Sequence, residues 1–200
     1  MKMNRLLLFL IVSLGLLSTA VISYAGSLSK PKVMNDETLI LTESLSKNYD
    51  TLILRDFTFD RAEYSNVSTD EKKVIDKISP SLVRTINDNV EAELKAKKVF
   101  KKIHKNTSPT GKAVILEGEI TEYNAGSKAL KMFVGFGAGK AYLKVKGRLI
   151  DASTGKELAL FEDQETGYLG SMTTMSYDDL FPIQAKDLGI SISKFIEAIY

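Results

Sequence analysis

The sequence contains no cysteine and a single histidine. The lack of cysteine excludes a disulfide framework, a thiolate nucleophile and a cysteine zinc site, and one histidine cannot supply a multi-histidine metal centre. Glycine and proline number only 13 and 4 among 200 residues, too few for collagen or a long disordered tail. With 44% hydrophobic and 26% charged residues, the composition is typical of a folded globular chain and excludes a multispan membrane protein.

Residues 1–25 have the features of an export signal. Lys2 and Arg5 give a positive start, an uncharged apolar stretch follows, and small residues precede the predicted cleavage between Ala25 and Gly26. The sequence therefore predicts a periplasmic or secreted protein. The same segment is just long enough to remain as an uncleaved anchor in the inner membrane, and this alternative stays open.

Removal of the leader changes the charge balance. The whole chain has 27 basic and 25 acidic residues, and the leader holds two of the basic ones and no acid. The mature chain is then formally neutral, so global charge gives no support for binding to nucleic acid. Contact with the membrane is expected only through the signal segment before its cleavage.

The mature chain has the patterns of a small α+β domain. We expect a flexible N-terminal lead-in over residues 26–44 and a single domain over 45–200. The predicted elements are a strand over 49–60, a helix from Ser68 that is interrupted at Ser79-Pro80, a second helix to about residue 97, strands over 112–123, 140–151 and 157–166, and a final helix from about residue 178.

The strand over 140–151 alternates most clearly. Leu143 and Val145 are expected to point inward, while Lys144, Lys146 and Arg148 are expected to point to water, as in a half-exposed antiparallel strand. The order of elements predicts a two-layer sandwich, in which a mainly antiparallel sheet of about four to five strands carries helices on one face.

A glycine-rich loop precedes that strand and is the first candidate site. Its residues are Gly135, Phe136, Gly137, Gly139 and Lys140. A phosphate-binding loop requires a glycine five positions before the Gly-Lys pair and a hydroxyl residue after it, and the dinucleotide pattern requires uneven glycine spacing. Neither condition is met, so we interpret the segment as a structural or partner-contacting loop. Residues 167–177, which include Met172 and Met175, form a second candidate contact region.

A run of lysines gives a candidate basic patch, composed of Lys97, Lys98, Lys101, Lys102 and Lys105. It is either an electropositive surface for an anionic lipid, glycan or partner, or a solvated helix end whose cations complement the helix dipole. His104 lies inside this run, and a hydrolase built on it is a further hypothesis. The sequence shows no orienting acid and no nucleophile elbow for that chemistry. No catalytic, cofactor-binding or metal-binding residue is assigned.

The stretch VGFGAGKAYLKVKGRLIDASTG, residues 134–155, resembles the hallmark of a bacterial domain-of-unknown-function family, numbered 4410. That family combines a GxGxGKA loop with an alternating strand that ends in DAxTG, and Arg55-Asp56-Phe57 is similar to its opening strand. The resemblance covers roughly residues 45–199 and implies a small envelope protein, often a lipoprotein, without assigned catalytic residues. This chain lacks the cysteine that a lipid anchor needs.

Together these patterns predict an exported bacterial envelope protein. We expect it to be non-enzymatic, to need no cofactor, and to act through contact with an envelope protein partner or with the envelope surface. The alternative is a periplasmic binding module for a small anionic ligand or glycan, which would use Lys140 and the lysine run.

Overall fold

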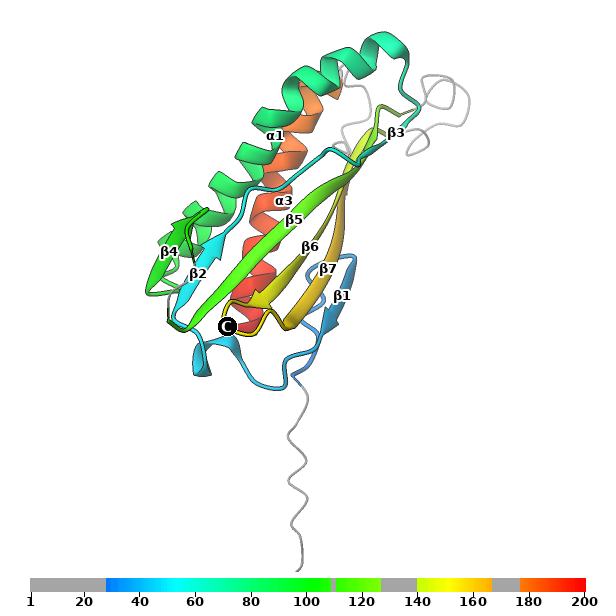
Figure 1. Ribbon diagram of the computed structural model, residues 1–200. Helices are drawn as coiled ribbons and strands as arrows, with labels where there is room; N and C mark the ends of the chain where they lie inside the picture. Colours follow the sequence, from blue (N-terminus) through cyan, green and yellow to red (C-terminus); the bar gives the residue numbers. More distant parts are fainter. Residues whose placement is uncertain (1–27, 109–110, 127–139, 167–176) are drawn as a thin grey trace, which may run out of the picture.

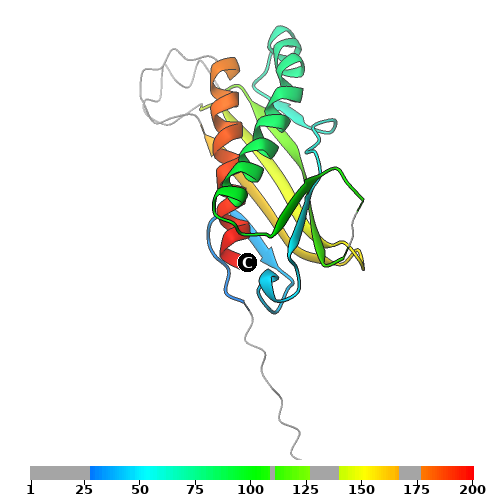
Figure 2. The same ribbon diagram turned by 90° about the vertical axis from the view of Figure 1, so that its left-hand side faces the viewer.

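The computed structural model describes residues 28–108, 111–126, 140–166 and 177–200, and these form two layers (Figure 1). One layer is a seven-stranded sheet. The other consists of two long helices, α1 (Thr69–Ala96) and α3 (Tyr177–Ile199), which lie on the same face of the sheet (Figure 2). The predicted α+β sandwich with helices on one face is therefore confirmed.

The sheet is mixed, and this corrects the expected mainly antiparallel sheet of four to five strands. Its strands are β1 (Asp36–Leu39), β2 (Thr51–Leu54), β3 (Glu63–Ser65), β4 (Lys102–Lys105), β5 (Ala113–Asn124), β6 (Tyr142–Asp151) and β7 (Glu157–Thr166). They run in the order β1-β7-β6-β5-β2-β4, with β3 on β5. The pairs β1/β7, β7/β6 and β6/β5 are antiparallel, whereas β5/β2, β2/β4 and β3/β5 are parallel.

The parallel pairing of β2 and β4 follows from the long helix between them. Two parallel neighbours need a crossover of a dozen or more residues, and α1 supplies it. Strand β4 and strand β3 have only four and three residues. Such short segments show too little alternation to be recognised as strands in a sequence.

Helix α1 is continuous through Pro80, so the predicted interruption at Ser79-Pro80 is wrong. The helix begins at Ser68 with the expected capping box, in which Ser68 and Glu71 satisfy each other's backbone N–H groups. Pro80 has no N–H to donate, and the Ser79 hydroxyl donates instead to the Ile75 carbonyl at 2.7 Å. Ile75 and Leu82 are both fully buried, so a single apolar stripe continues across the proline and favours one helix.

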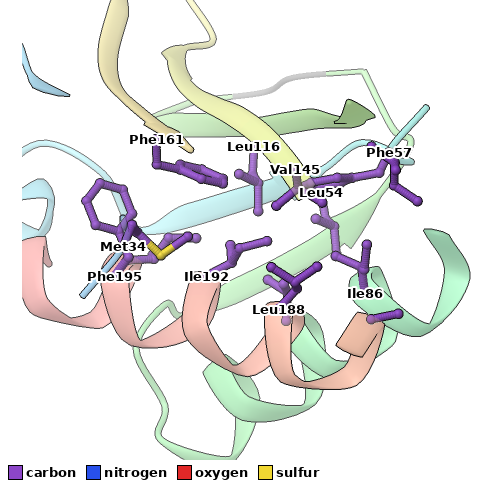
Figure 3. Packing of buried hydrophobic residues seen from close by; sticks show 14 of the residues in the cluster. Met34, Leu54, Phe57, Ile86, Leu116, Val145, Phe161, Leu188, Ile192 and Phe195 are labelled. Atoms are coloured by element: carbon purple, nitrogen blue, oxygen red, sulfur yellow. The ribbon is translucent and has the colours of Figure 1, made fainter. Parts of the chain in front are cut away.

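The core lies between the sheet and the helices (Figure 3). Leu116, Val145 and Phe161 contribute from the sheet, and Leu188 and Phe195 pack against them from α3. The inward set predicted for β6 is confirmed, because its alternate apolar side chains are buried while those between them point away from the helices.

Two glycines allow aromatic rings to lie flat on the middle of the sheet. Gly118 and Gly147 are cross-strand neighbours on β5 and β6. A Cβ atom at Gly118 would collide with the ring of Phe57, and one at Gly147 with the ring of Phe161. Glycine is required at both positions because the rings occupy the space that a side chain would fill.

The expected lead-in over residues 26–44 is corrected as well, because it contains β1, an edge strand of the sheet. The segment before β1 is held by Glu37, which is only 4% exposed. Its carboxylate accepts hydrogen bonds from the backbone N–H groups of Lys32, Val33 and Met34 at 2.9, 2.5 and 2.8 Å. The ordered fold therefore begins well before the predicted boundary at residue 45.

Candidate functional site

The predicted glycine loop falls mostly outside the residues that the structure describes. This applies to Gly135, Phe136, Gly137 and Gly139, to the cleavage position between Ala25 and Gly26, and to residues 167–176 with Met172 and Met175. Lys140 is described and is half-buried at the start of β6. Its neighbour Ala141 is tied to α3, because the Gln184 side chain donates to the Ala141 carbonyl at 3.1 Å.

The lysine run does not form one free basic surface. Lys97 pairs with Glu197 of α3, Lys101 with Asp50, and Lys105 with Asp88 and Glu91 of α1. The chain also reverses at Lys98, which has a positive φ of 54°. The reversal distributes the lysines over the end of α1, a turn and β4, so a large part of their charge is compensated locally.

His104 lies on β4, the edge strand of the sheet, and is exposed. Its neighbour on β2 is Ile53. Within the described part of the chain, its imidazole has no carboxylate or hydroxyl at hydrogen-bond distance. The arrangement of a base held by an orienting acid is therefore not assembled from these residues.

The most developed surface feature is a concavity on the sheet face opposite the helices, with a volume of about 750 Å³. We call it the open face. It is lined by Asp36, Thr38, Arg55, Asp56, Thr58, Arg61, Glu117, Gly118, Glu119, Lys146, Gly147, Arg148, Leu160, Phe161 and Glu162. Figure 2 shows the sheet edge-on, with α1 and α3 on the far side from this face. Nine of the lining residues are charged, so the concavity is strongly polar.

Ion pairs between adjacent strands form the floor of the concavity. Glu119 on β5 contacts Lys146 on β6 at 2.9 Å and Arg61 at 3.0 Å. Its side chain is only 11% exposed. The hydrogen bond from Lys146, followed by that from Arg61, holds the pKa of the Glu119 carboxyl below its usual value, so the floor keeps this group ionised.

A second set of pairs continues the floor. Arg148 on β6 contacts Glu117 on β5 at 2.6 Å and Glu157 on β7 at 2.7 Å. Hydrogen bonds to Glu157 and Glu117 raise the pKa of the guanidinium. Lys144 pairs with Glu162 at 3.0 Å. Each cation of β6 is thus matched by a carboxylate of a neighbouring strand.

Strand register produces this lattice directly. Glu117 is opposite Arg148 and Glu119 is opposite Lys146 in the antiparallel pair β5/β6. Residues two apart on a strand share a face, so two alternating charge patterns of opposite sign meet when the strands pair. Sequence reasoning placed Lys146 and Arg148 in water but missed Glu117 and Glu119, although the alternation in Glu-Gly-Glu was the available signal.

A separate acidic cluster lies on the helix side of the sheet, beside β1. Asp163 is 5% exposed and accepts from the backbone N–H of Asn35 at 3.2 Å. Burial, with a contribution from nearby Glu37, raises its pKa above the usual value. Burial also raises the pKa of Glu165, which lies near Ser191 of α3. These groups fix the N-terminal segment to the domain.

Two further searches apply to the described residues only. Among them, no group of His, Asp and Glu side chains is placed to hold a metal ion. None of the helices in the described ranges is both long and apolar enough to cross a membrane.

Comparisons with known proteins give one family and several distant folds. The model of a family described as a domain of unknown function, DUF4410, matches residues 52–171, from β2 to beyond β7. No curated protein matches the sequence.

Three solved structures illustrate the distant folds. The PelC dodecamer of Paraburkholderia phytofirmans is 12% identical, covers 80% of this chain and 94% of its own, and has a TM-score of 0.47. The hypothetical protein CT253 of Chlamydia trachomatis is 10% identical, with coverage of 76% and 97% and a TM-score of 0.47. A putative neuraminyllactose-binding hemagglutinin homolog of Helicobacter pylori is 9% identical, with coverage of 74% and 83% and a TM-score of 0.40.

Proposed function

This chain belongs to the DUF4410 family, and from that premise we propose that it is an exported bacterial envelope protein that acts by contact and not as an enzyme. The observation that carries the proposal is the open face. It is a concave and highly charged surface of about 750 Å³ on an ordered sheet, and the described helices leave it accessible. Polar concavities of this size are large enough to receive part of another molecule.

The chemistry of the lining supports contact rather than catalysis. The carboxylates of the floor are matched with cations, and Glu119 is held in its ionised form by Lys146 and Arg61. A general acid or base needs a pKa shifted toward neutrality, whereas these contacts shift the pKa of Glu119 away from it. A lattice of satisfied ion pairs is suited to specific recognition of a charged partner surface.

The direction of the chain supports a location at the envelope. The described chain begins and ends at the same end of the domain, where the C-terminus is marked in Figure 1. Helices α1 and α3 both begin at the opposite end. A leader or an uncleaved anchor would thus leave from one end and keep the sheet and its open face clear of the membrane.

Export is tested by analysis of the protein from cell fractions. We expect the protein in the periplasm or the medium with Gly26 as its first residue. A protein that retains Met1 and sits in the inner membrane would identify the uncleaved anchor. A protein that retains Met1 in the cell interior, without membrane association, would contradict the proposal.

The alternative, a module for a small anionic ligand or glycan, loses support from the lysine run, because Lys97, Lys101 and Lys105 are paired with carboxylates. Binding of anionic polymers in low salt measures what remains of it. If a charge-removing variant at Lys98 and Lys102 binds such polymers as the parent does, the basic patch has no role in binding.

Contact through the open face is tested by capture with altered surfaces. Thr38 and Thr58 are exposed and line the concavity, so Thr38→Arg with Thr58→Arg fills it without removing a floor ion pair. We expect this variant to lose partners that crosslink to the parent chain. Lys77→Arg with Arg84→Lys, on exposed α1, is the matched control and should keep them. Equal crosslinking by both variants would contradict the proposal.

A further inference from the structure

The two rims of the open face carry opposite charges that the chain itself does not neutralise. Asp36 on β1 forms one rim, and Arg55, directly after β2, forms the other. Among the described residues, neither side chain has an ion-pair partner. Arg55 is half-buried, and its backbone N–H donates to the Leu116 carbonyl at 2.9 Å, so the guanidinium is carried on an ordered segment.

The surroundings of Arg55 leave its charge available. Its neighbour Asp56 also lines the concavity, but the Asp56 carboxylate is occupied at 3.1 Å by the side-chain amide of Asn87 on α1. Arg61 adds a second cation to this rim, and its side chain is 82% exposed. Glu119 is shared by Arg61 and Lys146, so one carboxylate faces two cations there.

The face therefore has a negative rim, a floor of matched ion pairs, and a positive rim. The rims are separated by three strands, β7, β6 and β5, which corresponds to four strand spacings or about 19 Å. A surface with this polarity is complementary to itself. A two-fold axis perpendicular to the strands' common direction of charge, passing through the middle of the floor, places the negative rim of each copy against the positive rim of the other.

From this charge pattern, we infer that the open face is an interface for a second copy of this chain. In the resulting two-fold dimer, Asp36 of each copy pairs with Arg55 of the other, and the two concave floors enclose water between them. The inference rests on the proposed function, in which the open face is the contact surface, and it names the partner. Because the rims touch and the floors do not, the floor ion pairs stay intact within each copy.

The dimer is expected to be sensitive to salt, since solvated charge pairs at a rim are screened. Sedimentation velocity of the purified protein at low ionic strength should show a concentration-dependent dimer. Raising the salt concentration to about 0.5 M, where the screening length falls below that at 0.15 M, should return it to the monomer.

Charge reversal gives the decisive test. In Asp36→Arg, two arginines meet at each rim contact, and in Arg55→Asp two aspartates meet. Each variant alone should weaken dimerisation by about tenfold or more, because two attractive pairs per dimer become repulsive. An equimolar mixture of the two variants should form a heterodimer, because each arginine then faces an aspartate. Neither substitution removes an internal ion pair, and circular dichroism checks that both variants fold.

Arg84→Asp and Glu93→Arg on α1 are the matched controls. They make the same changes of charge away from the open face and should dimerise like the parent. A parent chain that is monomeric throughout, single variants that dimerise like the parent, or a mixture that stays monomeric would each overturn the inference. If the chain is monomeric but crosslinks to a different protein through the open face, the inference fails and the proposed function stands. If no crosslink depends on the open face, both fail.

Discussion

At the scale of single residues, a few buried or half-buried carboxylates organise the chain ends and turns. Glu37 collects three backbone N–H groups of the N-terminal segment, and Asp151 accepts from Tyr49, Ser153 and Thr154. A carboxylate is suited to this role because its two oxygens offer about four acceptor sites. Each of these groups joins segments that are distant in sequence or stabilises a tight turn.

Replacement of Glu37 by alanine should destabilise the domain by about 1–3 kcal/mol, because three backbone donors lose their acceptor in a buried setting. Urea unfolding followed by circular dichroism measures the loss. Glu43→Ala serves as the control, since Glu43 makes only an exposed ion pair with Lys47. If both substitutions had the same small effect, the Glu37 contacts would not hold the segment.

Asp151 predicts a specific dependence of stability on pH. Hydrogen bonds from Ser153, together with those from Tyr49 and Thr154, hold the pKa of its carboxyl well below the usual value. A depressed folded-state pKa stabilises the fold above the unfolded-state value, near 4, and the contribution is lost as the pH falls toward the folded-state pKa.

Asp151→Asn should therefore cost about 1 kcal/mol at pH 7, and the difference from the parent should shrink below pH 4. Denaturant unfolding at pH 7 and pH 3 measures it. Asp60→Asn is the comparison, because Asp60 is exposed and its side chain has no hydrogen bond within the described ranges. A penalty that stays constant with pH would show that the charge of Asp151 contributes nothing.

At the scale of secondary structure, the contact between the two helices depends on Gly189 of α3. A Cβ atom there would lie 2.7 Å from the Ile86 carbonyl oxygen and 2.8 Å from the Cβ of Asn89, both on α1. Glycine in a helix costs about 1 kcal/mol relative to alanine, so its presence indicates that close approach of the helices outweighs helix propensity here.

Gly189→Ala decides between these two effects by the sign of the change. We expect the free energy of unfolding to fall by about 1–3 kcal/mol, because the helices must separate to admit the methyl group. Lys194→Ala, at an exposed position of the same helix, should change it by less than about 0.5 kcal/mol. An increase in stability for Gly189→Ala would mean that α1 can move away at no cost.

The elements that the sequence reveals are those with long, regular patterns. The stripe of α1, its capping box at Ser68 and the alternation of β6 are all confirmed. The break at Pro80 was wrong because the local effect of a proline was outweighed by burial of a continuous apolar stripe. Strands β1 and β4 were missed or left open because four residues at a sheet edge are fixed by pairing and by contacts such as those of Glu37, not by a local pattern.

At the scale of the whole molecule, the similarity to the DUF4410 family is confirmed, whereas the topology of the sheet was not predictable. Parallel pairing of β2 with both β4 and β5 depends on the path of α1, which no local pattern records. The open face follows the same logic, because its ion pairs arise only when β5, β6 and β7 are in register. Sequence reasoning identified single charged residues, and pairing converted them into a surface.

The central claim, that the exported chain acts through its open face, is tested most directly by photo-crosslinking in living cells. A photoreactive amino acid is placed at Thr38 or Thr58 in the concavity, or at Lys77 or Arg84 on the outer side of α1. We predict a discrete crosslinked species in the envelope fraction from both open-face positions and none from the α1 positions. Crosslinks from α1 alone, or equally from all four positions, would contradict the account.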